Sequence, residues 1–417
     1  MKKILIVSFY WPPSGKASHH WPLKMANRLL EEGWLPSILT VKEDTFTDPD
    51  PDLEDAVDPR INVIRTKFWD PFAVYKKFLG KSENSSLVAS EALSLTDKSI
   101  KQRISIWIRM NLFVPDARVG WVIPGFREAK KIFKNEKFDA ILSNGPPHST
   151  HLLAKKISKK YTIPLVSVFI DPWVDIAYYK NQKRSLFTTW IDNRFEKSVI
   201  QSSSKLIFVT NTMKKYFKNK YKSIDDKSYL LYWGYNEENF SDVNKNKKND
   251  ELVILHAGNI FDYQNPVLFW EEVKREIENG MRIKIRFVGT VSPQVKKSIS
   301  KFKLDDITEY KGFLPYKNVI EEIVNSDILL VCATEPRHVP GKLFEYMRSG
   351  NRIVAFGEDN EEVREILNRT NAGELFSYDD DLKGILRGGN RETNMEEVKK
   401  FDRNNIALRL AEILKEL

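Results

Sequence analysis

Short apolar runs recur along the chain and alternate with longer segments in which apolar residues return every three or four positions. Such runs predict strands buried on both faces of a parallel sheet, and the periodic segments predict amphipathic helices. The expected strands are Lys3–Phe9, Pro36–Val41, Asn62–Arg65, Phe138–Ser143, Pro164–Ile170, Lys205–Val209, Tyr229–Trp233, Leu252–Ala257, Ile283–Val288, Ile328–Ala333 and Ile353–Phe356. The expected helices are His19–Glu32, Gly120–Asn135, a helix ending near Tyr161, Ser185–Ser202, Asn211–Tyr221, Ser292–Lys301, Tyr316–Asn325, Gly341–Ser349 and about Met395–Leu417.

This order of elements predicts an α/β protein with two Rossmann-like domains whose parallel sheets face an interdomain cleft. Asn236–Asp250 is rich in Asn and Lys and is the expected linker. It separates an N-terminal domain at 1–235 from a C-terminal domain at 251–394, and the helix at 395–417 follows. Residues 80–98 have weak periodicity and are expected to form a loop, and Tyr310–Phe313 a turn.

The composition agrees with two soluble domains, because 417 residues exceed one ordinary core. No apolar run approaches the length of a membrane span, residues 1–20 lack a secretory signal, and Cys332 is the single cysteine. We therefore expect a cytoplasmic protein without disulfides or a cysteine metal cluster. The net charge of +9 favours an anionic partner, such as nucleic acid, an anionic membrane or a phosphorylated ligand.

The segment Ser99–Phe113 has the pattern of a basic amphipathic helix. Its apolar face includes Trp107, and Lys101, Arg103 and Arg109 lie elsewhere on the helix. This pattern suits the surface of an anionic membrane, and a helix that faces the core of its own domain gives the same pattern. Four lysines of a later helix could add to the attraction or form an ordinary solvated face: Lys155, Lys156, Lys159 and Lys160.

The segment Ile328–Gly357 predicts a strand–loop–helix–strand unit. In such units ligands lie beyond the carboxyl ends of the strands, where the helix N-terminus offers N–H groups to phosphate. Lys342 and Glu345 stand in the first turn of this helix. The lysine could bind a phosphate and the glutamate a ribose diol, or they could be a surface lysine and a helix-dipole glutamate.

Two histidines, His148 and His151, lie between a strand and a helix of the first domain, and Asp171 ends the next strand. They could act on a ligand at this edge of the first domain, or they could cap a helix and start a turn. A metal site is not expected, because no cysteine ligands and no histidine-rich spacing accompany them. A serine nucleophile is poorly supported without a G-x-S-x-G elbow, and Asp48–Asp52 is interpreted as a solvated acidic loop.

Five motifs that occur in order resemble those of bacterial GT-B glycosyltransferases of the family-4 type, which build surface polysaccharides from sugar nucleotides. They are Tyr10–Gly15, Val114–Arg118 with Gly120 and Trp121, Ser143–His151, Asp171–Trp173 and Lys342–Met347. The resemblance implies a retaining, metal-independent transfer between two Rossmann domains. It places Glu345 on the donor ribose, the loop Ser14–Lys16 with Gly15 at a phosphate, and His148 or His151 on the acceptor side. It also implies that the C-terminal helix packs back on the first domain.

The sequence departs from the family pattern at three points. Arg337 stands at the first position of the family's E-x7-E pair, with Glu335 two residues earlier. Lys16 replaces the second glycine of the N-terminal loop. Gln264 replaces a basic residue after the turn at Gly258 and Asn259, which leaves Lys342 and Arg337 to supply positive charge at the donor site.

The sequence therefore predicts a cytoplasmic glycosyltransferase, peripheral on the inner membrane face, that moves a sugar from a nucleotide donor to a growing, lipid-linked glycan. It needs no cofactor and no metal ion, and nucleic acid is not expected as a partner. A GT-B sugar-nucleotide 2-epimerase and a catalytically silent binding subunit are the alternatives. The Ser99–Phe113 helix and the N-terminal loop disfavour the epimerase, and the broken E-x7-E pair is compatible with the silent subunit.

Overall fold

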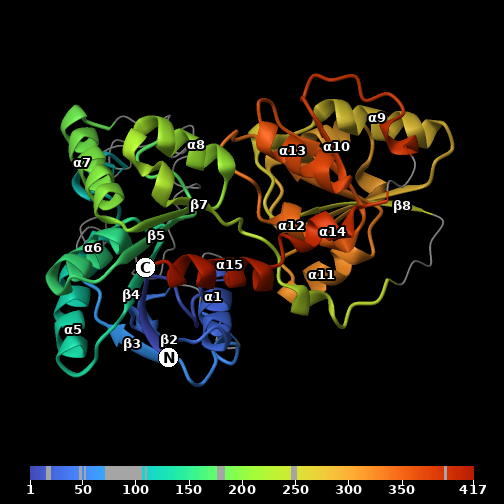
Figure 1. Ribbon diagram of the computed structural model, residues 1–417. Coiled ribbons are helices and arrows are strands. Elements are labelled where there is room, and N and C mark those ends of the chain that lie inside the picture. Colours follow the sequence, from blue (N-terminus) through green and yellow to red (C-terminus); the bar gives the residue numbers. More distant parts are fainter. Residues whose placement is uncertain are drawn as a thin grey trace. The chain divides into compact units, whose positions relative to one another are not determined.

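The computed structural model describes residues 1–15, 20–46, 49–50, 53–70, 106–108, 110–175, 184–245, 251–388 and 392–417 (Figure 1). Contacts divide the chain into two compact units, Met1–Leu231 with Ala407–Leu417, and Tyr232–Ile406. The boundary at Leu231 precedes the segment 236–250 that the sequence suggested as a linker. Phe240 of that segment is buried in the core of the second unit, so its first residues belong to a domain.

The first unit contains a seven-stranded sheet in which all pairings are parallel. The strand order is β3 (Asn62–Thr66), β2 (Trp34–Val41), β1 (Lys2–Ser8), β4 (Ala140–Gly145), β5 (Leu165–Phe169), β6 (Lys205–Phe208) and β7 (Ser228–Leu230). The helices are α1 (His20–Glu31), α5 (Val122–Asn135), α6 (Ser149–Tyr161), α7 (Leu186–Ser202) and α8 (Asn211–Lys220).

The central strands β1 and β5 of this sheet are mostly apolar because both faces are covered. Leu5 and Val7 of β1 share a core with Leu153 of α6, whereas Ile4 and Ile6 are equally buried but lie outside that core. Adjacent residues of a strand point to opposite faces, so an unbroken apolar run is what a doubly covered sheet requires.

The second unit contains a six-stranded parallel sheet with one core on each face. The strand order is β10 (Thr308–Gly312), β9 (Ile283–Val288), β8 (Leu252–Ala257), β11 (Ile328–Cys332), β12 (Arg352–Phe356) and β13 (Gly373–Phe376). Helices α11 (Tyr316–Val324), α12 (Lys342–Ser349), α13 (Glu361–Thr370) and α14 (Met395–Lys399) contribute to one core, and α9 (Val267–Glu278) and α10 (Pro293–Lys301) to the other.

Two predictions about the later part of the chain are wrong. Tyr310–Phe313 is not simply a turn, because Thr308–Gly312 pairs with β9 as an edge strand whose side chains stay partly exposed. The C-terminal helix is two helices, α14 and α15 (Arg403–Lys415). Between them the Phe401 carbonyl accepts from the Tyr235 amide and the Arg403 amide donates to the Tyr235 carbonyl, so these groups cannot continue a helix.

The strand order reverses beside the first strand of each sheet, between β1 and β4 in the first unit and between β8 and β11 in the second. In open α/β sheets such switch points hold the ligand, since the loops at the carboxyl ends of the two strands diverge there. The switch points therefore locate where candidate site residues should be sought. None of the helices in the described part of the chain is long and apolar enough to cross a membrane.

Candidate active site

The switch point of the second unit brings Lys342 against the end of β8. The Lys342 ammonium nitrogen lies 3.3 Å from His256 Nε2. Gly258 follows β8 with a φ of +103°, and a Cβ at this position would lie 2.8 Å from Lys342 Nζ. Glycine is required both for this backbone conformation and for the close approach of the lysine. The side chain of Asn259 accepts from the Thr290 amide and so fixes the turn.

His256 is a residue of this site that the sequence did not single out. Its Nδ1 is 3.0 Å from the Leu330 carbonyl, and its Nε2 is 3.4 Å from the Asn259 carbonyl. The shorter contact favours the hydrogen on Nδ1, which leaves Nε2 to accept from Lys342. Burial and the charge of Lys342 lower the pKa of His256 to about 3, which keeps it neutral. The sequence does carry one signal for His256, because it is a polar residue inside the apolar run Leu252–Ala257.

Glu345 lies one helical turn after Lys342 and is partly buried. It accepts a hydrogen bond from the Tyr316 hydroxyl. Burial raises the pKa of the Glu345 carboxyl, and the Tyr316 hydrogen bond and the charges of Arg403 and Lys342 oppose this rise. The helix beneath them is held in place by Tyr346, whose hydroxyl accepts from the Ala257 amide at 2.8 Å.

Arg337 pairs with Glu335, with 3.2 Å between Nε and the carboxylate. The loop that carries both is fixed by Asn360, which is fully buried and donates to the carbonyls of Ala333, Glu335 and His338. Because Arg337 replaces the first glutamate of the E-x7-E pair, this loop contains an ion pair between two of its own residues.

The two histidines of the first unit differ in their surroundings. His151 is fully buried, with Nδ1 2.8 Å from Ser143 Oγ, and a Cβ on Gly145 would lie 2.5 Å from its Nε2. His148 is 6% exposed and stacks on Trp173 with 4.8 Å between ring centroids. Its Nε2 lies 3.3 Å from the Pro172 carbonyl and must donate, which leaves the buried Nδ1 as an acceptor without a partner in the described part of the chain.

Both imidazoles are neutral at ordinary pH. Burial lowers the pKa of His148 to about 3 and that of His151 well below its usual value. A neutral ring can accept a hydrogen bond at one nitrogen and donate at the other. Each ring has one buried nitrogen without a partner among the described residues, Nδ1 in His148 and Nε2 in His151, and of the two rings only that of His148 is slightly exposed.

The loop that holds the histidines is positioned by residues whose role the sequence did not reveal. Asp116 accepts from both the amide and the hydroxyl of Ser149 at the start of α6. Trp173 donates to Asp192 of α7, which also pairs with Arg184 at 2.7 Å. These contacts join parts of the chain distant in sequence, which is why the motif Val114–Arg118 alone could not disclose them.

The other candidates of the first unit lie apart from the two histidines in the sequence. Asp171 follows β5 by two residues and is partly buried, and Gly15 is exposed after β1. Lys16, Lys101, Arg103 and Arg109 lie outside the described residues. Trp107 is described and is about half exposed, and Lys155 and Lys156 contact Ser198 and the Phe126 ring within their own unit.

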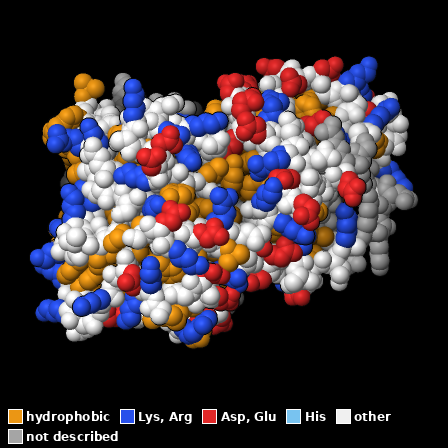
Figure 2. Space-filling model, viewed as in Figure 1, with side chains coloured by type: hydrophobic (Ala, Val, Ile, Leu, Met, Phe, Trp, Pro, Cys, Tyr) orange, Lys and Arg blue, Asp and Glu red, His pale blue; other side chains and the backbone are white. Residues whose placement is uncertain are grey.

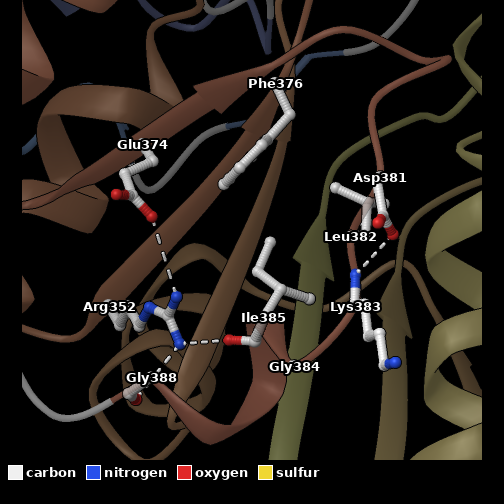
Figure 3. A pocket seen from close by; sticks show the side chains of 9 residues that line it. All are labelled: Arg352, Glu374, Phe376, Asp381, Leu382, Lys383, Gly384, Ile385 and Gly388. Carbon is white, nitrogen blue, oxygen red and sulfur yellow. Dashed lines mark hydrogen bonds and ion pairs between the residues drawn. The ribbon is translucent and has the colours of Figure 1, made fainter.

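A pocket of about 340 Å³ lies elsewhere in the second unit (Figure 3). Arg352, at the amino end of β12, donates to the carbonyls of Ile385 and Gly388 and lies 3.9 Å from Glu374. The guanidinium is therefore already hydrogen-bonded to backbone carbonyls of the same unit. The pocket contains none of the predicted donor residues, and we do not assign a ligand to it.

The fold and the matches to known families define the class of protein. Residues 88–239 match Glycosyltransferase Family 4 and residues 237–384 match Glycosyl transferases group 1. The protein is a glycosyltransferase with a GT-B fold, as its motifs predicted. It belongs to the family-4 type of group 1 glycosyltransferases. A comparison with curated protein sequences finds no match.

Solved structures of similar fold cover the whole chain. Sucrose-phosphate synthase (tll1590) from Thermosynechococcus elongatus has a TM-score of 0.66 at 15% identity, over 100% of this chain and 99% of that one. Anabaena Alr3699/HepE in complex with UDP has a TM-score of 0.63 at 12% identity, over 100% of both chains. A UDP-N-acetylglucosamine 2-epimerase has a TM-score of 0.53 at 12% identity, over 100% of this chain and 95% of that one.

Proposed function

We propose that the protein transfers one sugar from a nucleotide-sugar donor to a growing, lipid-linked glycan, with retention of configuration and without a metal ion. The observation that carries the donor half is the meeting of Lys342, His256 and Gly258 at a switch point of the second unit. Helix α12 starts there without a side-chain cap, and its dipole favours a diphosphate, while the Leu343 and Phe344 amides donate to the Pro340 and Gly341 carbonyls. The UDP bound by Anabaena Alr3699/HepE supports a nucleotide donor.

In this proposal the acceptor hydroxyl forms a bond to the anomeric carbon as the bond from that carbon to the diphosphate breaks. The first turn of α12 and Lys342 stabilise the charge on the departing diphosphate, and Glu345 accepts hydrogen bonds from the ribose hydroxyls. His148 Nδ1 accepts a hydrogen bond from a sugar hydroxyl, and Asp171 orients the acceptor. The leaving diphosphate takes the proton of the acceptor hydroxyl, so no separate base is assigned.

A thermal-shift panel of UDP-, GDP-, ADP- and dTDP-sugars tests the donor half. A ligand at 100 times its Kd stabilises the folded state by about 2.7 kcal/mol. We therefore expect the sugars of one nucleotide in this panel to raise the Tm of the protein by several degrees. If none of the four raises it, the donor assignment is wrong.

The affinity for the diphosphate is expected to fall as pH rises above 8. Burial lowers the pKa of the Lys342 ammonium to about 8, so its charge is present below that pH and lost above it. Calorimetric titration with UDP at about pH 7 and about pH 9 measures the effect. Lys342→Arg is the matched control, since arginine stays charged and should remove the decline. The same decline in Lys342→Arg would contradict the role of Lys342.

The membrane part of the proposal rests on an exposed surface of the first unit formed by Leu186, Phe187, Trp190, Trp107 and Leu112. Asn111 joins its two segments, because its side chain accepts from the Ser185 amide and donates to the Trp107 carbonyl. The Arg194 guanidinium lies 5.1 Å from the Trp190 ring centroid. At the left edge of Figure 2, where α7 lies in Figure 1, hydrophobic side chains adjoin basic ones. Aromatic and aliphatic side chains beside basic ones suit the interface of an anionic bilayer.

We expect the protein to sediment with vesicles containing phosphatidylglycerol, and added salt to weaken this binding because it screens exposed charges. Phe187→Ser with Trp190→Ser should reduce the bound fraction severalfold, since each removes buried apolar area from the interface. Phe313→Ser is the control, because Phe313 is 86% exposed but belongs to the second unit. Equal binding to neutral and anionic vesicles, or an equal loss in the control, would refute the assignment.

A further inference from the structure

The second unit contains a buried arginine that no described carboxylate neutralises by direct contact. Arg403, the first residue of α15, is 4% exposed. Its Nε donates to the Trp233 carbonyl at 3.1 Å, and the guanidinium carbon lies 5.3 Å from the centroid of the Trp233 ring. Its two terminal nitrogens donate to none of the described residues. Burying a charge without a partner is costly, so this arrangement indicates an anion that binds from outside.

Trp233 places this arginine beside the start of α12. A Cβ on Gly341 would lie 3.1 Å from Cδ1 and 3.2 Å from Nε1 of Trp233, so the indole covers the residue at which the helix begins. Arg403 is also close enough to oppose the rise in the pKa of Glu345 that burial causes, although the two side chains form no ion pair in the described structure. The guanidinium therefore lies near the uncapped helix N-terminus and the carboxylate proposed for the ribose.

We propose that Arg403 binds a phosphate group of the nucleotide-sugar donor. This inference rests on the proposed function and adds a residue to its donor site. The two free terminal nitrogens of a guanidinium match two phosphate oxygens, and an aromatic ring on its face holds it in orientation.

Arg403 also supplies a positive charge that the other residues predicted for the donor site do not provide. The side chain of Gln264, which stands where the family often has a basic residue, accepts from the Phe261 amide and so closes its own turn. Arg337 is engaged by Glu335. Lys342 and Arg403 thus supply the cationic groups for a diphosphate, one from α12 and one from α15.

Calorimetric titration of Arg403→Gln with UDP, uridine and inorganic pyrophosphate tests this role. Loss of a charge-assisted hydrogen bond predicts about 10- to 100-fold weaker binding of UDP and pyrophosphate, and a change of less than about twofold for uridine. Arg409→Gln is the matched control, since Arg409 is exposed on the same helix. Unchanged UDP binding, or an equal loss for uridine, would overturn the proposal, because the second result indicates a role through Glu345 or the fold.

Arg403→Lys decides the question if Arg403→Gln does not fold. Lysine keeps the charge but loses the planar fork, so UDP and pyrophosphate should bind more weakly than to the wild type while uridine is unaffected. Equal affinity of Arg403→Lys and the wild type for all three probes overturns the proposal. If the wild type binds no nucleoside diphosphate of the four bases, the proposed function fails as well. If it binds one and the Arg403 variants bind it equally, only the role of Arg403 fails.

Discussion

Replacing His148 by alanine is expected to lower the rate of sugar transfer about 100-fold or more and to leave donor affinity unchanged. The imidazole is held between the Pro172 carbonyl and the Trp173 ring, and its Nδ1 is a buried acceptor without a partner among the described residues. A hydroxyl placed against this nitrogen would lose its hydrogen bond in the variant. Rates measured with saturating donor, together with the Kd of the donor, separate the two effects.

His151→Ala and His338→Ala are the comparisons for this variant. His151 is enclosed by Ser143, Gly145 and the Phe169 ring, so its removal should lower the Tm through lost packing. His338 is exposed in the loop after β11 and should be neutral. Full activity of His148→Ala would contradict the assignment, as would a larger kinetic defect in a folded His151→Ala.

The same geometry predicts the pH dependence of the reaction. Because burial lowers the pKa of His148 to about 3, the ring is neutral from about pH 4 upward and should cause no loss of activity near pH 6.5. A decline in activity around pH 6.5 that disappears in His148→Gln would show that the ring titrates there, and this result would contradict the prediction.

Glu345→Ala is expected to weaken donor binding about 10- to 100-fold with little change in the fold. A charge-assisted hydrogen bond from a ribose hydroxyl to the carboxylate is worth about 1.5–3 kcal/mol, and a net loss of about one such bond gives this range because about 1.4 kcal/mol is tenfold in affinity. In the free protein the carboxylate accepts from the Tyr316 hydroxyl, which a ribose would have to replace or share.

Tyr316→Phe is the informative partner of this variant. It removes the internal hydrogen bond but keeps the carboxylate, so donor affinity should be retained or improved, whereas Glu345→Gln should bind donor weakly. Calorimetry with the base found in the thermal-shift panel measures all three variants. Wild-type affinity of Glu345→Ala would rule out the ribose contact.

The sequence located many strands well because the signals for strands are local. Leu252–Ala257 is an apolar run with one polar residue, and Ile283–Val288 begins with alternating apolar and basic residues. Each run precedes a glycine, and the observed strands have these same bounds. Ser185 and Ser292 marked helix starts, and each accepts from the backbone at the position expected of an N-cap. The residues that follow such strands can therefore be placed at ligand-binding edges from the sequence alone.

The features that sequence reasoning missed depend on contacts between distant segments. The break before Arg403 exists because Tyr235 pairs with the backbone on both sides of it, and nothing near Arg403 announces this. β10 is an edge strand with half-exposed side chains, so its apolar pattern is weak. Arg403, Asp116 and Asn360 are single polar residues whose roles arise only when Trp233, Ser149 and the loop after β11 lie against them.

Donor turnover in the absence of acceptor, followed by mass spectrometry, tests most directly the claim that the protein transfers sugar from a nucleotide. The nucleotide sugar selected by the thermal-shift panel is incubated with the wild type, with Glu345→Ala and with Glu361→Ala as an exposed control. The account predicts slow release of free sugar and nucleoside diphosphate by the wild type and the control, and much less by Glu345→Ala. An epimerised nucleotide sugar, or no turnover of a donor that binds, would contradict it.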